Sequence, residues 1–237
     1  MQLSPRSLDV SQNRLLGALP ADEVERLIPT FQQISFSLGD VVYEFSGHLD
    51  YVYFPTTAII SLLYTMENGA TAEMGLTGND GVVGIALFMG GETMPNRAVV
   101  QSAGDAVRMK AKVLQAEFAL GGKFQRLLLR YTQALITQIS QTAVCNRLHS
   151  VEQQLCRWLL LSHDRLRTDE LIMTQELMAD MLGVRREGVT VAAGYLQDIG
   201  AISYVRGRIQ ILDREKLEGT ACECYQVVKD EFDRLLG

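Results

Sequence analysis

Residues 173–197 read MTQELMADMLGVRREGVTVAAGYLQ, and their spacing predicts two short helices joined by a sharp turn. Thr174 can cap the first helix, because its hydroxyl can accept a hydrogen bond from an unpaired backbone N–H. Gly183 stands where that helix must end, a position that commonly needs a positive φ. Four apolar residues at helical spacing predict a buried side for this helix: Leu177, Met178, Met181 and Leu182.

Three residues indicate that the two helices form a helix-turn-helix. Small Ala179 lets the helices cross closely, Gly183 makes the turn, and Val189 packs the second helix onto the first. In a DNA-binding helix-turn-helix the second helix enters the major groove with its N-terminal residues at the base edges. An ordinary pair of packed helices can carry the same three residues, so the motif alone leaves both interpretations open.

The stretch that follows favours DNA binding. Two β-type runs, residues 201–205 and 209–211, flank Arg206-Gly207-Arg208 and predict a hairpin with arginines at its tip. A helix-turn-helix followed by such a hairpin is a winged helix. Its arginines can contact phosphate while the helix reads bases.

The composition describes a globular protein. At 237 residues, with 47% hydrophobic and 21% charged residues, the chain suits one large or two ordinary domains. No stretch approaches the ~20 apolar residues that span a membrane. The first ten residues, MQLSPRSLDV, lack the apolar core of a secretory signal, so we expect a cytoplasmic protein that does not engage a membrane.

The four cysteines are Cys145, Cys156, Cys222 and Cys224. They form no CxxC pair and no His/Cys cluster with the sequence spacing of metal ligands, so we expect free cytosolic thiols and no metal site. Cys222 and Cys224, with one residue between them, are a weak indication of redox chemistry or metal binding. The sequence leaves their role open.

The net charge of −6 is unevenly distributed. Residues 1–122 carry seven Lys/Arg and thirteen Asp/Glu, a balance of −6, whereas residues 123–237 carry fifteen of each. Residues 184–214 hold five arginines and three acids, a balance of +2, whereas residues 215–237 hold three bases and six acids, a balance of −3. The excess of basic residues lies in the predicted DNA-binding segment, which is compatible with a small contact area on DNA and an affinity that falls with salt.

The N-terminal half predicts a jelly-roll-type β-roll over residues 12–122. A short helical lead-in occupies residues 12–30, with a break at Pro20. Short β-rich segments then alternate with glycine or aspartate turns, and Asn68-Gly69 is a good hairpin signal. The expected strands are residues 33–37, 41–45, 51–54, 59–66, 70–75, 98–102 and 106–110.

Glycine recurs at every third position in GLTGNDGVVG, residues 75–84. A phosphate-cradling loop would continue into GK[ST] or stand between a strand and a helix, and neither pattern is evident. We therefore expect turns within the β domain.

From Lys123 to Leu148 the chain runs without proline or glycine and predicts one long helix. Either this helix is a connector packed on its own domain, or its apolar stripe also pairs with the same helix of a second subunit as a short coiled coil. We favour the second interpretation, a homodimer. Gln138, Gln141 and Thr142 interrupt the heptad pattern, so the sequence does not define the register of the coiled coil. The stripe comprises Phe124, Leu127, Leu128, Tyr131, Leu135, Ile136 and Ile139.

The C-terminal half begins after this connecting helix, which we place at residues 123–149. Ser150 is expected to cap a further helix over residues 151–167. The winged helix-turn-helix domain then spans residues 150–214, and an acidic helical tail occupies residues 215–237. The predicted fold class is α+β.

In this order of elements the chain resembles the cyclic-AMP receptor protein/FNR family of bacterial transcription regulators, over about residues 12–212 and most strongly over 174–202. The resemblance implies a cyclic-nucleotide-binding-like β-roll, a homodimer formed by the long helix, and two recognition helices that read a pseudo-palindromic DNA site. Arg186-Glu187 matches the Arg-Glu pair at the start of the family's recognition helix, and both residue types suit base readout. Val191 stands where the cyclic-AMP receptor protein has a further arginine, so we expect a different target sequence.

The predicted recognition helix runs from Arg186 to Gln197. DNA contacts are expected from seven residues: Thr174, Arg185, Arg186, Glu187, Thr190, Arg206 and Arg208.

The predicted effector site departs from the family pattern. Cyclic-nucleotide binders of the family carry Gly-Glu-Leu and Arg-Ser/Thr-Ala, whereas the matching positions here are Gly84-Ile85-Ala86 and Asn96-Arg97-Ala98. The carboxylate is missing and the arginine is displaced by one position, which turns it to the opposite face of a strand. We therefore expect that cyclic AMP is not the ligand. The cysteines do not match the family's iron–sulfur pattern, and His48, His149 and His163 are expected to be structural or solvated, so no cofactor is predicted.

The predicted function is a sequence-specific, homodimeric transcription regulator, with double-stranded DNA and RNA polymerase as its partners. The alternative is a ligand-binding or protein-interaction module whose winged helix no longer reads DNA. An enzyme is the least favoured class, because no nucleophile–base pair or phosphate loop is evident. The sequence identifies neither an effector nor the direction of regulation.

Overall fold

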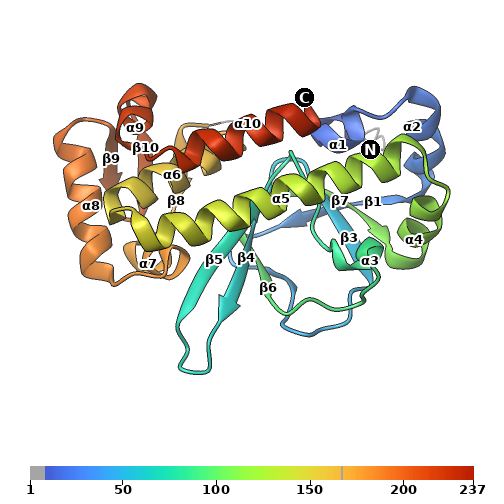
Figure 1. Ribbon diagram of the computed structural model, residues 1–237, viewed down its shortest axis with the longest axis horizontal. Coiled ribbons are helices and arrows are strands. Elements are labelled where there is room, and N and C mark those ends of the chain that lie inside the picture. Colours follow the sequence, from blue (N-terminus) through green and yellow to red (C-terminus); the bar gives the residue numbers. More distant parts are fainter. Residues whose placement is uncertain (1–8, 167) are drawn as a thin grey trace, which may run out of the picture.

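The structure is a computed structural model that describes residues 9–166 and 168–237. The long helix α5 (Gly122–Leu148) runs along the molecule, with β-sheets on one side and α10 (Cys224–Leu236) on the other (Figure 1). The winged helix lies at one end of α5 and the N-terminal helices lie at the other. The α+β class is confirmed.

Two antiparallel sheets form the β-roll, one with strand order β1-β7-β3 and the other with order β2-β6-β4-β5. All seven predicted strands are present, within a few residues of the expected bounds. Apolar side chains from both sheets fill the space between them, including Phe54, Ile60, Val100 and Met109. The strands are β1 (Phe31–Phe36), β2 (Val41–Tyr43), β3 (Tyr51–Pro55), β4 (Ile59–Thr65), β5 (Thr71–Thr77), β6 (Arg97–Ser102) and β7 (Gly104–Lys110).

Short helices close the ends of the β-roll. Pro20 separates α1 from α2, as the sequence predicts. Buried Asn13 caps α1 and donates from Nδ2 to the backbone oxygens of Pro55 and Gly81, each at 2.9 Å, which fastens the N-terminal segment to the roll. The helices are η1 (Val10–Gln12), α1 (Arg14–Gly17), α2 (Ala21–Leu27), η2 (Ile28–Thr30), α3 (Ala86–Met89) and α4 (Ala111–Ala119).

The glycine-rich segment 75–84 lies where the β-roll meets the helices. A Cβ on Gly78 would stand 2.8 Å from the Cβ of Arg165, and one on Gly81 would overlap the ring of Tyr131. The segment does turn, but at these two positions glycine is required by the close approach of neighbouring side chains. Only Gly84 has a positive φ there, at 104°.

The predicted long helix is present, but the use of its apolar stripe was predicted wrongly. Five stripe residues are buried within their own chain, Ile139 is partly buried against the same core, and only Ile136 is exposed. The reason is that β5 and α10 both pack on α5 and cover this side of it. The five buried residues are Phe124, Leu127, Leu128, Tyr131 and Leu135.

The C-terminal half is a winged helix followed by two helices. The sequence missed strand β8, which pairs with β10 and completes a three-stranded sheet of order β8-β10-β9. Helix α6 ends at His163, earlier than predicted, and Arg167 lies outside the described residues. The elements are α6 (Val151–His163), β8 (Glu170–Ile172), α7 (Gln175–Leu182), α8 (Arg186–Asp198), β9 (Ile202–Val205), β10 (Arg208–Ile211), α9 (Arg214–Thr220) and α10. Within the described ranges no helix is long and apolar enough to cross a membrane.

Helix α6 joins the winged helix to the β-roll through buried polar contacts. The indole Nε1 of Trp158 donates to Glu73 Oε1 at 3.1 Å. Gln101 Nε2 donates to the hydroxyl of Ser162 at 2.9 Å. The apolar core is likewise continuous from the roll into the winged helix, so the two parts are packed against each other.

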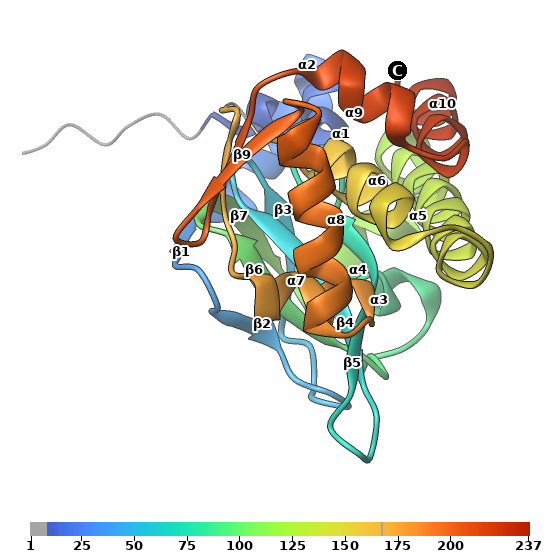
Figure 2. The same ribbon diagram turned by 90° about the vertical axis from the view of Figure 1, so that its left-hand side faces the viewer.

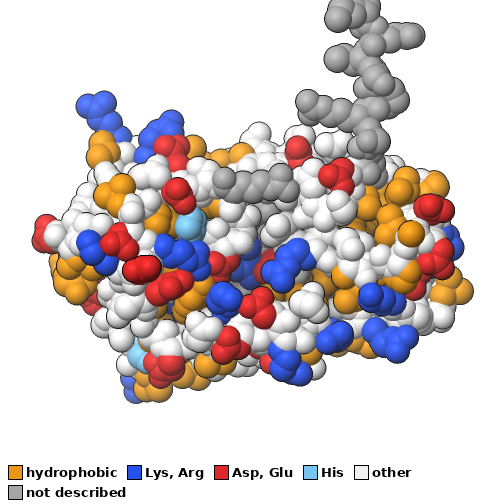
Figure 3. All heavy atoms as spheres, turned by 90° about the horizontal axis from the view of Figure 1, so that it is seen from above, with side chains coloured by type: hydrophobic (Ala, Val, Ile, Leu, Met, Phe, Trp, Pro, Cys, Tyr) orange, Lys and Arg blue, Asp and Glu red, His pale blue; other side chains and the backbone are white. Residues whose placement is uncertain are grey.

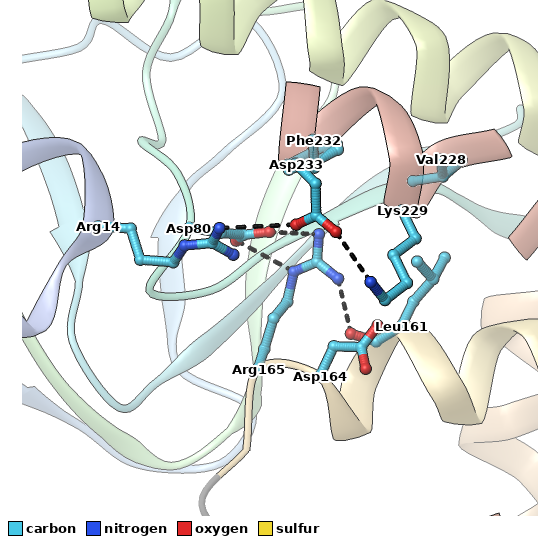
Figure 4. Close-up of a pocket in the computed structure, with 9 residues that line it drawn as sticks. All are labelled: Arg14, Asp80, Leu161, Asp164, Arg165, Val228, Lys229, Phe232 and Asp233. Carbon is cyan, nitrogen blue, oxygen red and sulfur yellow. Dashed lines mark hydrogen bonds and ion pairs between the residues drawn. The ribbon is translucent and has the colours of Figure 1, made fainter. Parts of the chain in front are cut away.

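A charged pocket of about 210 Å³ lies between α6, α10 and the loop that follows β5 (Figure 4). Buried Arg165 forms an ion pair with Asp80 at 2.6 Å and donates to the backbone oxygen of Leu161 at 2.6 Å. Asp233 of α10 pairs with Lys229 at 2.8 Å in the same pocket. These charges neutralise one another, so the pocket fastens the three elements together.

Candidate nucleic-acid interface

Helix α7 and the turn after it have the geometry that the sequence predicts. The hydroxyl of Thr174 accepts from the backbone N–H of Leu177 at 3.2 Å and caps the helix. Gly183 adopts φ 66° in the left-handed region, and the N–H of Val184 returns to the carbonyl of Ala179 at 3.0 Å. This bond is of the kind that closes a helix end around a left-handed glycine.

Helix α8 packs against α6 and α7 and presents its other face to solvent. Its buried face consists of Val189, Ala192, Ala193 and Leu196. Because these residues turn inwards, the opposite face carries Arg186, Glu187, Thr190 and Val191, all exposed. Figure 2 faces this end of the molecule and shows α8 across its front. We call these four residues the reading face.

Thr190 has a role that the sequence did not predict. Its hydroxyl lies 3.0 Å from Gln175 Oε1 and 3.0 Å from the backbone oxygen of Arg186. The contact with Gln175 links the start of α7 to the reading face. The hydroxyl keeps lone pairs for a further partner, so this contact and a DNA contact are compatible.

The predicted hairpin is a two-residue turn at Arg206-Gly207. The backbone φ is 51° at Arg206 and 79° at Gly207, and positive φ at both residues is typical of the tight hairpin turn that matches strand twist. Arg206 is exposed at the tip. The carbonyl of Gly207 accepts from the backbone N–H of Met173 at 2.8 Å, so the tip is held beside the start of α7.

Arg208 is already engaged within the chain. Its Nη1 lies 2.6 Å from Glu170 Oε1, and both side chains are largely exposed. The sequence missed this partner because it missed strand β8. The wing also contacts α8, since the backbone N–H of Tyr204 donates to Gln197 Oε1 at 3.0 Å. Burial raises the pKa of the Tyr204 hydroxyl above its ordinary value.

The winged-helix segment also matches a known protein family. Residues 153–220 match the family described as the Crp-like helix-turn-helix domain. The chain carries a Crp-like helix-turn-helix domain. No curated protein has a matching sequence. The family match confirms the predicted resemblance over residues 153–220.

Solved structures show the same fold over most of the chain. FixK2 from Bradyrhizobium japonicum is 16% identical, with a TM-score of 0.67 over 81% of this chain and 98% of that one. A CRP/FNR-family transcriptional regulator from Eubacterium rectale is also 16% identical, with a TM-score of 0.65 over 87% of this chain and 96% of that one. A CRP/FNR-family regulator from Thermus thermophilus is 20% identical, with a TM-score of 0.61 over 80% and 98%.

Beside the reading face of the Crp-like domain lies Tyr195, which was not predicted from the sequence to contact DNA. Tyr195 is exposed and stands four residues after Val191, one turn further along α8. In the sequence, Tyr195 is four residues after Val191, a spacing that places the two side chains on the same side of a helix. The hydroxyl of an exposed tyrosine at this edge can donate a hydrogen bond to a phosphate oxygen of duplex DNA.

The predicted effector residues do not converge on one site. Ala98 is fully buried, and Asn96 is buried with its Nδ2 bonded to the hydroxyl of Tyr43 at 3.0 Å. Arg97 lies on the other face of β6, where its Nε pairs with Glu44 at 3.1 Å. Gly84 packs against the backbone of β3, and Ile85 and Ala86 open α3. The displaced arginine therefore points away from the interior of the roll, as the one-residue shift predicts.

The four cysteines are free thiols, as predicted, but three of them lie in one cluster that the sequence did not predict. Cys145, Cys222, Cys224 and His149 lie together, with one ligand atom from each inside a cluster whose members are all within 4.8 Å of one another. His149 was predicted to be structural or solvated, and it belongs to this cluster. The sequence concealed the cluster because the pairs 145/149 and 222/224 are more than seventy positions apart and meet only when α10 folds back on α5.

Proposed function

We propose that this protein is a cytoplasmic, homodimeric transcription regulator that binds a specific DNA sequence. The observation that carries the proposal is the exposed N-terminal face of α8, with Arg186 and Glu187 in its first turn, on a Crp-like helix-turn-helix domain. In DNA-binding domains of this geometry the start of the second helix meets base edges in the major groove.

The proposed DNA contacts divide into base-contacting groups on the reading face and phosphate-contacting groups around it. Arg186 can bond bidentately to guanine, Glu187 can accept from cytosine N4, and Val191 can pack on a thymine methyl. Thr174 and Arg185 lie at the helix starts, where a hydroxyl, a guanidinium and unpaired N–H groups suit phosphate. Arg206 at the wing tip adds a cation that can contact phosphate whatever the base sequence.

Arg208 contributes less to DNA binding than the sequence suggests. Its guanidinium lies 2.6 Å from Glu170, so a phosphate contact must compete with this carboxylate or share the cation with it. Exposed ion pairs of this kind contribute about 0–1 kcal/mol, so the exchange is feasible. A phosphate contact made by Arg208 should therefore add less binding free energy than one made by Arg206.

The charge distribution on the face that carries α10 agrees with a small footprint. This face shows Lys/Arg and Asp/Glu side chains interspersed, without a field of one sign (Figure 3). The proposed attraction to DNA comes from residues 184–214, whose charge balance is +2, and binding is expected to be sensitive to salt.

Homodimerisation is proposed through a side of α5 that shares only Ile136 with the predicted stripe. Leu129, Ile136 and Val144 are 44%, 56% and 45% exposed on this helix, and Ala143 is exposed beside Val144. We call these four residues the outer seam. The seven-residue spacing from Leu129 to Ile136 and from Ile136 to Ala143 is that of a coiled-coil position. Two domains paired in this way would read half-sites about 34 Å apart, one turn of DNA.

The β-roll is proposed as the regulatory part, and cyclic AMP is not expected to be its ligand. The residues at the nucleotide-contacting positions are neutral or point outwards, and Arg97 is paired with Glu44. The roll contacts α6 directly, which supports a path by which it could influence the Crp-like domain. RNA polymerase is the proposed partner on DNA.

Selection of binding sites from random duplexes, followed by fluorescence anisotropy, tests the proposal. We expect enrichment of a pseudo-palindrome, with Arg186→Ala costing about 1–3 kcal/mol on that site and relaxing one base position. Lys112→Ala, an exposed cation on α4 distant in sequence from the reader, is the matched control. Absence of any enriched sequence at low salt would favour the alternative, a protein-interaction module that does not read DNA.

A further inference from the structure

Three segments bring cysteine and histidine side chains to one point. Cys145 and His149 are four residues apart at the C-terminal end of α5, and Cys222 and Cys224 lie between α9 and the first residue of α10. The start of α10 lies beside this end of α5, above it in Figure 1. Their ligand atoms are all within 4.8 Å of one another.

The separations suit a single tetrahedral ion. Cys145 Sγ lies 3.5 Å from Cys222 Sγ, and Cys224 Sγ lies 3.5 Å from Nδ1 of His149. With Zn–S bonds of ~2.3 Å and Zn–N bonds of ~2.0 Å, the edges of a tetrahedron are about 3.8 Å between sulfurs and about 3.5 Å between sulfur and nitrogen. The sulfurs are too far apart for a disulfide, whose S–S bond is ~2.05 Å.

The surroundings of the cluster favour a thiolate-bound cation. All three cysteines are buried, and the side chain of His149 is 16% exposed. The imidazole offers Nδ1 to the cluster while Nε2 lies 3.4 Å from a carboxylate oxygen of Glu223. A carboxylate that accepts from the second ring nitrogen of a ligating histidine fixes its tautomer and orientation.

A buried arginine supplies the remaining charge. The side chain of Arg157 is buried, its Nη1 donates to Thr142 at 3.1 Å, and its Nε has no hydrogen-bond partner. Thr142 stands one turn before Cys145 on α5, so the guanidinium lies near the cluster. Three thiolates and a neutral imidazole around a divalent ion carry a net charge of −1, which this guanidinium would balance.

We propose that Cys145, His149, Cys222 and Cys224 bind one Zn²⁺ ion in a structural Cys₃His site. The three thiols lose their protons on binding, and His149 coordinates through Nδ1 while its Nε2–H donates to Glu223. Four protein ligands leave no open position, which is typical of a structural rather than a catalytic zinc site.

The site would fasten the C-terminal helix to the end of the long helix. Cys145 lies in the last turn of α5 and His149 follows that helix, immediately before α6 begins the Crp-like domain, and Cys224 begins α10. Zinc would therefore fix α10 along α5 and define the junction from which the Crp-like domain extends. This role is independent of whether the domain binds DNA.

The test uses the full chain, purified without a histidine tag under reducing conditions and incubated with Zn²⁺ or Co²⁺. We expect about one Zn²⁺ per chain by elemental analysis, and with Co²⁺ the visible bands and thiolate charge-transfer absorption of a tetrahedral site. Less than about a tenth of an equivalent of bound Zn²⁺, or cobalt without thiolate absorption, would overturn the proposal. A purified protein with iron–sulfur absorption, or with a Cys145–Cys222 disulfide in place of metal, would overturn it as well.

Matched variants separate metal binding from folding. Cys224→Ser and His149→Ala should each lower zinc affinity at least tenfold, whereas Cys156→Ser, a buried cysteine outside the cluster, should retain one equivalent. Glu223→Gln keeps all four ligands and alters an exposed side chain, so it should fold normally. We expect its zinc affinity to fall about 10–100-fold. Unchanged affinity in Cys224→Ser and His149→Ala would refute the ligand assignment.

Discussion

The carboxylate of Glu73 lies 3.1 Å from the indole nitrogen of Trp158, fully buried between the β-roll and the Crp-like domain. Burial raises the pKa of Glu73 to about 7, against the opposing effects of Ser61, Arg157 and Trp158. Its second oxygen has no hydrogen-bond partner. This contact therefore joins the two parts of the chain through a group that titrates near neutral pH.

Stability should depend on the protonation of Glu73. Because its folded pKa is raised from 4.5 to about 7, its favourable contribution is present below pH 4.5 and is lost as the pH rises through about 7. Glu73→Gln removes the titration while keeping an acceptor for Trp158. By chemical denaturation, this variant should be more stable than the wild type by about 3 kcal/mol at pH 8 and no more stable at pH 4.5.

Glu67→Gln, on the exposed loop of the same hairpin, is the control for this prediction. It should leave the pH dependence of unfolding unchanged. Equal stability of Glu73→Gln and the wild type at pH 8 would mean that Glu73 is not buried as a titrating group.

Arg165 and Asp80 should be a costly pair to break. The ion pair is 2.6 Å long, and both side chains are buried, at 4% and 7% exposure. Arg165→Ala leaves the carboxylate of Asp80 buried without its cation, so the free energy of unfolding should fall by about 3–5 kcal/mol. Arg14→Ala, which breaks a largely exposed 3.7 Å pair with Asp233 in the same pocket, should cost less than about 1 kcal/mol in the same denaturation experiment. Equal losses in the two variants would contradict the assigned difference in burial.

Arg206 and Arg186 should differ in what they do on DNA. Arg206→Ala should weaken binding to specific and random duplexes alike and reduce the salt slope by about 1, because a phosphate contact is lost. Arg186→Ala should instead lower the preference for the specific duplex. Anisotropy titrations at several salt concentrations measure both quantities, and a sequence-dependent loss in Arg206→Ala would reassign that residue to base contact.

Ile136 should be central to dimerisation. It is 56% exposed on the outer seam of α5, and Ile136→Glu places a charge where two seams would meet. Light scattering coupled to gel filtration should show a dimer for the wild type and a monomer for this variant. Val227→Glu, at a 40% exposed apolar position on α10, should stay dimeric. A dimer that survives Ile136→Glu would place the interface elsewhere.

Local spacing predicted the elements well because their signals are local. The cap at Thr174, the left-handed Gly183 and buried Val189 follow from helix geometry within one short stretch. The β-strands follow from alternation and turn residues in the same way. Strand β8 was missed because it pairs with β10, more than thirty residues away, and this pairing leaves no local signal.

Periodicity identified an apolar side of α5 but not its partner. The stripe that includes Leu128 and Tyr131 is covered by β5 and α10, and no local signal in α5 reports what packs upon it. The spacing of Gly78 and Gly81 likewise suggested turns, while the space they leave is filled by Arg165 and Tyr131 from distant parts of the chain.

The sequence by itself determined the winged helix, the β-roll, the long helix and the loss of the nucleotide-contacting pattern, because each depends on residues close together in the chain. Only the tertiary structure decided which face of α5 is open, what Arg208 pairs with, and that Cys145 and His149 meet Cys222 and Cys224. These relationships arise when segments far apart in the chain pack together, and the spacing of residues along a sequence does not report which distant segments will be close in space.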